Sequence, residues 1–119
     1  MTPEEFDDVC DRDFGFLRDE YAFIPGPTVV RYGGYFFSKR FEGRCLSITV
    51  RWDELDEMGE VTLHQNGLFV GDYGYNLVVF LIEKYRRPDR KMEDEDTYQW
   101  QARMLKENAL DWLTEQRIV

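Results

Sequence analysis

The sequence of 119 residues contains little of what marks several common classes of protein. It has one histidine and two cysteines, and its longest uninterrupted apolar run is residues 77–82 (LVVFLI). A helix that spans a membrane needs about twenty predominantly apolar residues, so this run is too short for one. The first residues lack the basic, apolar and small-residue regions of a secretory signal. We therefore expect a cytoplasmic protein without a membrane segment.

The scarcity of cysteine and histidine limits disulfide, metal and nucleophilic chemistry. Cys10 and Cys45 do not make a disulfide scaffold, and neither has a second cysteine at the CxxC spacing of a zinc site. We expect both to be reduced and largely buried, with a single bridge between them as the alternative. A nucleophilic triad has only His64 as its base, and no serine or cysteine lies in a nucleophile motif. We expect no metal, no cofactor and no enzymatic activity, and a small carboxylate-based enzyme is the least favoured alternative.

Acidic residues outnumber basic ones in this chain. The 24 Asp and Glu against 15 Lys and Arg give a formal net charge of −9, which repels the phosphate backbone of nucleic acids. The hydrophobic content of 43% and aromatic content of 16% argue against disorder. The length fits one domain that covers residues 1–119. The expected partner is a basic protein, rather than a nucleic acid or a membrane.

The first segment has the pattern of an amphipathic helix over residues 2–21. Thr2 is a suitable N-cap, Pro3 fits the first helical position, and Glu5 completes the pattern of a capping box. One apolar stripe runs along this helix through Phe6, Cys10, Phe14 and Leu17. A glycine inside a helix costs about 1 kcal/mol relative to alanine, so we expect a bend or an end near Gly15.

The hydrophobic period changes to two after a proline-rich break, which predicts antiparallel strands. These strands are expected at residues 28–32, 35–41, 45–52 and 61–65, with a short fifth at 68–70. Glycine-containing pairs predict the turns between them, at Gly33-Gly34, Glu42-Gly43 and Asn66-Gly67. In the third strand the apolar residues Leu46, Ile48, Val50 and Trp52 alternate with Cys45, Ser47, Thr49 and Arg51. One face of the sheet is therefore expected to be covered, and the opposite face to meet solvent or a partner.

The segments between these strands and the C-terminus are less regular. Residues 53–59 (DELDEMG) are expected to be an acidic connection, and residues 71–76 a loop rich in Gly and Tyr. The run at 77–82 fits a buried strand or a buried helix, and we favour a helix over residues 76–86. A basic loop follows at residues 86–91 (RRPDRK), and the sequence leaves its role open.

The clearest helical pattern in the chain covers residues 93–116. Four acidic residues open it, at the positive end of the helix dipole. Its apolar stripe consists of Tyr98, Ala102, Leu105, Ala109 and Trp112, with Trp100 and Met104 available to widen it. The order of elements predicts an α+β fold, with an antiparallel meander of four to five strands. The N-terminal helix and the C-terminal helices are expected to pack on one face of this sheet.

The best candidate for a functional site is the acidic connection after the third strand. Two other acidic clusters are explained by the N-terminal ends of helices, and this one is not. We predict a partner-binding site here, formed by Asp53, Glu54, Asp56, Glu57 and Glu60. A protein that binds a basic partner combines aromatic anchors with an acidic rim. Tyr35 and Phe37 are the candidate anchors on the open face, whereas Trp52 aligns with the core positions.

Three segments carry a resemblance to known proteins, namely residues 14–23 (FGFLRDEYAF), 29–32 (VVRY) and 45–50 (CLSITV). Their order resembles that of small bacterial proteins that open with a helix, continue into a meander of strands and close with a long helix. Several such families are immunity proteins encoded beside polymorphic toxins. The resemblance implies an α+β domain that binds a toxin effector domain and blocks it by occlusion, as a monomer or homodimer, and it transfers no site residues. The alternative is a structural or assembly protein that acts as a homo-oligomer through the open face or an edge of its sheet.

Overall fold

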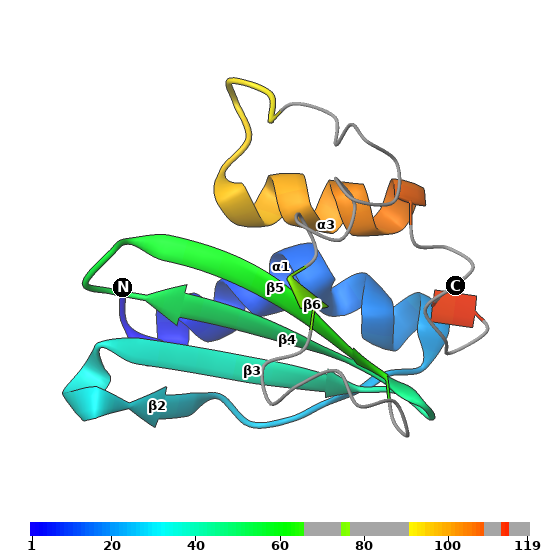
Figure 1. Ribbon diagram of the computed structural model, residues 1–119, viewed down its shortest axis with the longest axis horizontal. Coiled ribbons are helices and arrows are strands. Elements are labelled where there is room, and N and C mark those ends of the chain that lie inside the picture. Colours follow the sequence, from blue (N-terminus) through cyan, green and yellow to red (C-terminus); the bar gives the residue numbers. More distant parts are fainter. Residues whose placement is uncertain (66–74, 77–90, 109–112, 115–119) are drawn as a thin grey trace.

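The computed structural model describes residues 1–65, 75–76, 91–108 and 113–114. Helix α1 (Pro3–Tyr21) precedes an antiparallel sheet and helix α3 (Thr97–Asn108) follows it. Both helices contact the sheet, α1 through β3 and α3 through β5, and they contact each other (Figure 1). The predicted α+β fold, with helices on one face of a meander, is confirmed.

The sheet contains six short to medium strands in the described residues. They are β1 (Ile24–Pro25), β2 (Val29–Arg31), β3 (Phe36–Glu42), β4 (Leu46–Asp53), β5 (Met58–Gln65) and β6 (Tyr75–Asn76). Their spatial order is β1-β3-β4-β5-β6, and β2 also pairs with β3. The 3-10 turn η1 (Tyr32–Gly34) joins β2 to β3, with positive φ angles of 68° at Gly33 and 100° at Gly34. The predicted turn at this glycine pair is therefore confirmed.

Strand β5 begins earlier than the sequence predicts. Asp53 pairs with Met58 and Trp52 pairs with Gly59, so the acidic connection is a turn of four residues rather than the predicted 53–59. Glycine is common in loops, but Gly59 has a role in packing, because a Cβ atom there would lie 2.7 Å from Cζ of Tyr98. The glycine therefore lets the Tyr98 ring approach the backbone of the strand.

Some predictions for the middle of the chain are corrected, and others lie outside the described residues. Tyr75 and Asn76 pair with β5 and so belong to a strand rather than to the predicted loop, because they extend the backbone ladder at Thr62 and Leu63. The predicted helix at 76–86 does not begin at Asn76, which lies in β6, and its other residues fall outside the described part of the chain. The turn at Asn66-Gly67, the strand at 68–70 and most of the basic loop at 86–91 also fall outside it.

Helix α1 has the predicted start but does not break at its glycine. The Thr2 hydroxyl accepts a hydrogen bond from the backbone N–H of Glu5 at 3.1 Å, which caps the helix. The helix continues through Gly15 to Tyr21, so the predicted bend or end near Gly15 is wrong. Phe14 and Leu17 on either side of the glycine are fully buried, and this packing outweighs the low helix propensity of glycine.

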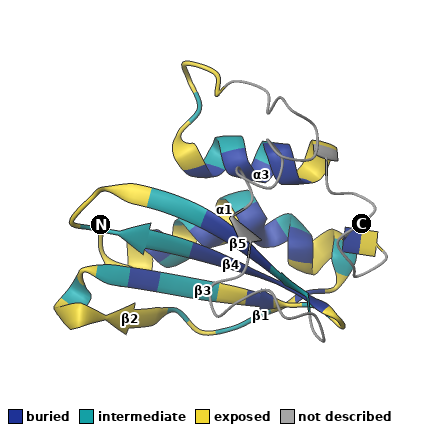
Figure 2. Cartoon of the chain, in the orientation of Figure 1, coloured by how far each residue is buried: buried dark blue, intermediate teal, exposed yellow. Residues whose placement is uncertain are grey.

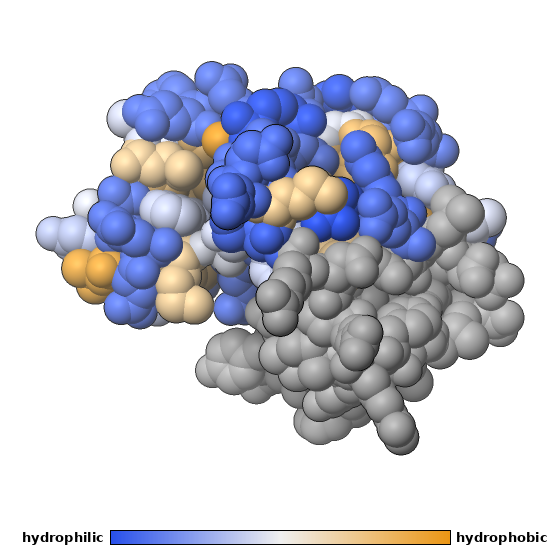
Figure 3. Space-filling view, turned by 90° about the horizontal axis from the view of Figure 1, so that it is seen from above, coloured by the Kyte–Doolittle hydropathy of each residue, from blue (hydrophilic) through white to orange (hydrophobic). Residues whose placement is uncertain are grey.

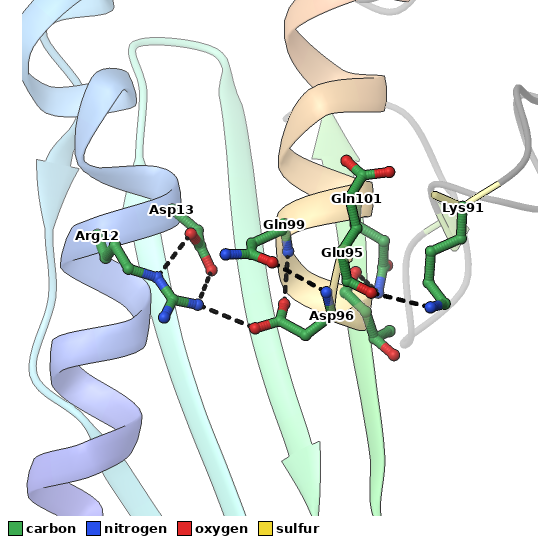
Figure 4. A network of polar contacts seen from close by, with 8 residues as sticks. Arg12, Asp13, Lys91, Glu95, Asp96, Gln99 and Gln101 are labelled. Atoms are coloured by element: carbon green, nitrogen blue, oxygen red, sulfur yellow. Dashed lines mark hydrogen bonds and ion pairs between the residues drawn. The ribbon is translucent and has the colours of Figure 1, made fainter. Parts of the chain in front are cut away.

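Helix α3 begins later than the predicted residue 93, at Thr97. The Asp96 carboxylate accepts the Gln99 backbone N–H at 2.8 Å, and the Gln99 side chain accepts the Asp96 N–H at 2.9 Å (Figure 4). This reciprocal capping box sets the start of the helix. Arg12 of α1 also donates to Asp96 at 3.0 Å, which ties the two helices together. The predicted end at residue 116 lies outside the described residues.

The core lies between the helices and the inner face of the sheet, where the buried residues gather (Figure 2). Tyr98 stands at its centre, with its ring edge-on to Phe6 and Phe14 and tilted against Trp52. Met104 is buried and Trp100 packs against the core, so both widen the apolar stripe of α3 as predicted. None of the described helices is long and apolar enough to cross a membrane.

The outer face of the sheet is less open than the sequence predicts. Ser47 is 0% exposed, and Thr49 and Thr62 are also buried. Their short side chains lie beside longer cross-strand neighbours, Arg40 next to Thr49 and His64 next to Ser47. The middle of β4 and β5 therefore does not meet solvent, which is one of the two environments predicted for this face.

The two cysteines differ in burial, contrary to the prediction that both are buried. No disulfide joins them, and Cys10 is buried in the core on the inner side of α1. Burial raises the pKa of the Cys10 thiol to about 12, which keeps it protonated and unreactive. Cys45 is exposed because it lies one residue before β4, in the turn from β3, and so outside the alternating pattern of the strand.

Candidate functional site

The predicted acidic residues lie at one end of the sheet, where the β4–β5 turn meets η1 and the N-terminus (Figure 1). Phe36 at the start of β3 pairs with Asp53, and Asp53 pairs with Met58. The backbone N–H of Glu54 donates to the Tyr35 carbonyl at 2.8 Å, which holds the turn against the segment that follows η1. We call this end the turn-end surface, formed by Tyr32, Tyr35, Phe36, Leu55, Met58 and the acidic residues Asp53, Glu54, Asp56, Glu57 and Glu60.

Large apolar side chains are exposed across the turn-end surface. The exposed fractions are 78% for Tyr32, 53% for Tyr35, 74% for Leu55 and 59% for Met58. The Tyr32 ring stands edge-on to the half-buried Phe36 ring, with their centres 6.3 Å apart. Figure 3 shows hydrophobic patches among hydrophilic residues at this end of the molecule. Such a mixture of apolar and polar exposed groups is typical of a surface that binds another protein.

One of the two predicted aromatic anchors is correct and the other is wrong. Tyr35 is exposed as expected. Phe37 is only 1% exposed, because the alternation along β3 turns it to the inner face, where its ring lies 5.7 Å from that of Phe6. The neighbouring Phe36 occupies the outer face instead, and the exposed Tyr32 was not predicted as an anchor.

Two of the five predicted site residues hold the turn in shape. One oxygen of Asp53 accepts the backbone N–H groups of Leu55 at 2.9 Å and Asp56 at 3.2 Å. The Glu54 carboxylate accepts the indole N–H of Trp52 and the N-terminal ammonium of Met1, the latter at 3.0 Å. These two contacts lower the pKa of Glu54, the Trp52 hydrogen bond first. Asp53 and Glu54 therefore have structural partners already.

The other three acids remain more available to a partner. Asp56 and Glu57 are exposed, and neither forms an ion pair or a side-chain hydrogen bond with any described residue. Glu57 is the last residue of the turn before β5 and has a positive φ of 50°, in the left-handed region that L-residues other than glycine rarely adopt. Glu60 faces Arg51 across the two strands at 3.9 Å, a long distance for an ion pair.

A small cavity lies within the turn-end surface, on the outer face of the sheet. It has a volume of about 270 Å³ and is lined by Phe36, Arg51, Asp53, Asp56, Met58 and Glu60. We call it the turn pocket. It brings together three predicted acids with Phe36, Arg51 and Met58, which the sequence did not predict for the site. The signal for these three was the strand register, which places Phe36 and Met58 on either side of Asp53 and Arg51 opposite Glu60.

The single histidine lies on the outer face, opposite Ser47. Burial lowers the pKa of His64, and the positive charges of Arg40 and Arg51 lower it further, against the opposite effect of Glu42. The Ser47 hydroxyl is fully buried and makes no hydrogen bond with a described residue, so His64 does not contact it as a base contacts a nucleophile. In the described residues, no group of three or more His, Cys, Asp or Glu side chains is arranged to hold a metal ion.

A larger hollow lies at the far end of α1, away from the predicted site. Its volume is about 470 Å³, and its described lining is Glu20, Tyr21, Ala22, Arg44, Leu113 and Thr114. It contains one acid and one base rather than converging carboxylates. None of the predicted site residues lines it.

Comparisons of the chain with protein-family models, with curated proteins and with solved structures find no match. The turn-end surface itself is therefore the basis for a functional conclusion.

Proposed function

We propose that this protein is a non-catalytic binding protein whose turn-end surface covers a functional surface of a basic protein. The observation that carries this proposal is the coincidence of exposed apolar side chains and unpaired acids at one end of the sheet. Tyr32 and Leu55 are each more than two-thirds exposed, and Asp56 and Glu57 follow Leu55 in the turn without ion pairs to described residues. Apolar anchors supply affinity in such a surface and the charges supply orientation and specificity.

Charge supports the choice of a basic partner. The segment from residue 53 to residue 60 contains five acids and no base, within a chain whose net charge is −9. A field of this sign steers a positively charged protein toward the site and raises the rate of association. Salt screens the field with a Debye length of about 10 Å at 0.1 M, so association is expected to slow as salt is added.

In the form implied by the sequence resemblance, the partner is a toxin effector domain and this protein is its cytoplasmic immunity protein. Neutralisation then needs no chemistry, because a tightly bound protein excludes the substrate of the toxin from a basic cleft.

The alternative of assembly through the sheet edges has less support. Pro25 and Pro27 interrupt the edge formed by β1 and β2, and proline donates no backbone hydrogen bond to an added strand. Near the other edge, the Gln101 side chain accepts the Val61 N–H and donates to the Gly59 carbonyl, both at 3.0 Å. These backbone groups of β5 are therefore already satisfied.

The test is capture of the partner from native lysate by the tagged full chain and by two charge-reversed double variants. The first carries Asp56→Lys and Glu57→Lys at the turn-end surface, and the matched control carries Glu93→Lys and Asp94→Lys in the exposed turn before α3. Both variants change the net charge equally. We expect the wild type and the control to retain the same basic protein at low salt, and the first variant to lose it. Equal retention by all three, or recovery of the wild type as a self-associated oligomer by light scattering, would refute the proposal.

A further inference from the structure

We propose that the turn pocket receives a single arginine side chain of the partner, an inference that rests on the proposed function of the turn-end surface. The size of the pocket is the first argument. Pockets for small organic ligands usually have volumes of about 300–1,000 Å³, and the turn pocket, at about 270 Å³, lies below that range. It suits one long side chain that enters from an opposing protein surface.

The lining matches an amphipathic side chain with a positive head. Phe36 and Met58 provide apolar contact for an aliphatic stem, and the exposed Tyr32 ring extends this contact beyond the Phe36 edge. Among the described lining residues there are three carboxylates and one guanidinium, that of Arg51, which gives this part of the pocket a net negative charge. A cation therefore gains attraction inside the pocket, whereas an anion is repelled.

Two of the three carboxylates can accept new hydrogen bonds without disrupting the fold. Asp56 has no ion pair or side-chain hydrogen bond within the described residues. The only described partner of Glu60 is Arg51, at 3.9 Å and with the Glu60 side chain 41% exposed. Asp53 differs, because it already accepts two backbone N–H groups of the turn. The incoming cation is therefore expected to contact Asp56 and Glu60.

The pocket favours arginine over lysine as the source of that cation. A guanidinium is planar and presents several N–H donors, so it can bridge two carboxylates while it stacks on an aromatic ring. The Phe36 ring and the carboxylates of Asp56 and Glu60 line the same cavity and offer both contacts at once. An ammonium is a compact, strongly hydrated charge that makes less use of a flat ring.

The test uses the isotope-labelled full chain and three short peptides, acetyl-Gly-Arg-Gly-amide and its lysine and citrulline counterparts, titrated by NMR. Citrulline keeps the shape of arginine and removes its charge. We expect saturable amide shifts at Phe36, Arg51 and Met58, with the arginine peptide bound most tightly and the citrulline peptide about fivefold more weakly or worse. Absence of saturable shifts there, equal binding of citrulline, or tighter binding of lysine would overturn the proposal.

A matched pair of variants separates the pocket from the general acidity of the turn. Asp56→Asn and Glu57→Gln each remove one exposed charge from neighbouring positions, and only Asp56 lines the pocket. Asp56→Asn is expected to weaken binding of the arginine peptide about threefold, and Glu57→Gln to leave it nearly unchanged. Equal weakening by both variants would overturn the pocket assignment, because it would indicate a diffuse charge effect.

The pocket and the proposed function fail in different ways. If the peptides do not bind but Asp56→Lys with Glu57→Lys still abolishes capture of the basic partner, the pocket assignment is wrong and the proposed function stands. If capture is unaffected by that double variant, the proposed function itself is wrong.

Discussion

The contact between α3 and β5 and the turn-end surface differ in how far their side chains have partners within the fold. In the first region, the buried Gln101 amide has both of its polar atoms bonded to the backbone of β5, at Val61 and Gly59. In the second, Tyr32 and Leu55 are exposed, and Asp56 forms no ion pair with a described residue. Folding therefore accounts for every polar atom of Gln101 and does not account for the exposed groups of the turn. This difference points to the turn-end surface as the part available to a partner.

The largest effect on stability is expected from Gln101→Leu. The substitution leaves the Val61 N–H and the Gly59 carbonyl without the contacts that Gln101 provides, in a buried site. Each unsatisfied buried group costs about 1–3 kcal/mol, so the loss of both contacts should lower the free energy of unfolding by about 2–6 kcal/mol. Chemical denaturation followed by circular dichroism measures this loss.

The matched control is Glu107→Gln, an exposed position on the same helix, where we expect a change within about 0.5 kcal/mol. A loss for Gln101→Leu no larger than that of the control would show that the amide is not structurally important, and the contrast between the two regions would disappear.

A smaller effect is expected from the only histidine, and it depends on pH. The pKa of His64 is lowered in the folded protein by burial and by Arg40 and Arg51, with Glu42 acting in the opposite direction. The unfolded chain therefore binds the proton more readily, and stability should fall as the pH decreases from about 6.5 toward the folded pKa. His64→Gln should remove this dependence. The measurement is the free energy of unfolding of the wild type and of His64→Gln at pH 7.5 and pH 5.5. An equal loss of stability in the two proteins would contradict the prediction.

The smallest effect on stability is expected at the tip of the turn. Asp56→Lys combined with Glu57→Lys should change the free energy of unfolding by less than about 0.5 kcal/mol, because neither side chain has an ion pair in the described residues. Glu54→Lys should destabilise the protein visibly more, because Glu54 holds both Trp52 and the N-terminus. Thermal unfolding of the two variants compares them directly. If the double variant were less stable than Glu54→Lys, the assignment of a structural role to Glu54 and of a binding role to Asp56 and Glu57 would be wrong.

Local patterns predicted much of the fold. The cap at Thr2 and the apolar stripe of α1 depend on residues close in sequence, and both are confirmed. The alternation along β4 correctly places Leu46, Ile48 and Val50 in the core, but Ser47 and Thr49 between them are buried as well. The errors occur where a residue distant in the sequence determines the local structure. From the sequence, Gly59 is assigned to a loop, whereas in the structure it lies in β5 with the Tyr98 ring packed against it. Gly15 stays helical because its neighbours are buried in the core.

The candidate site was predicted only in part, for the same reason. Charge alone identified the acids of the turn, but it does not distinguish Glu54, which is held by Trp52, from Asp56, which is free of described ion pairs. Phe36 and Met58 join the site only through the register of three strands, which the sequence does not specify without the turn lengths.

The most direct test of the central claim is the dissociation constant of the captured basic partner, measured from about 0.05 M to 0.5 M salt. We expect binding by the wild type and by the Glu93→Lys, Asp94→Lys control to weaken steeply as salt screens the charges. The Asp56→Lys, Glu57→Lys variant should bind far more weakly, with little dependence on salt. Equal affinity and equal salt dependence in all three proteins would contradict the claim that the turn-end surface binds the partner.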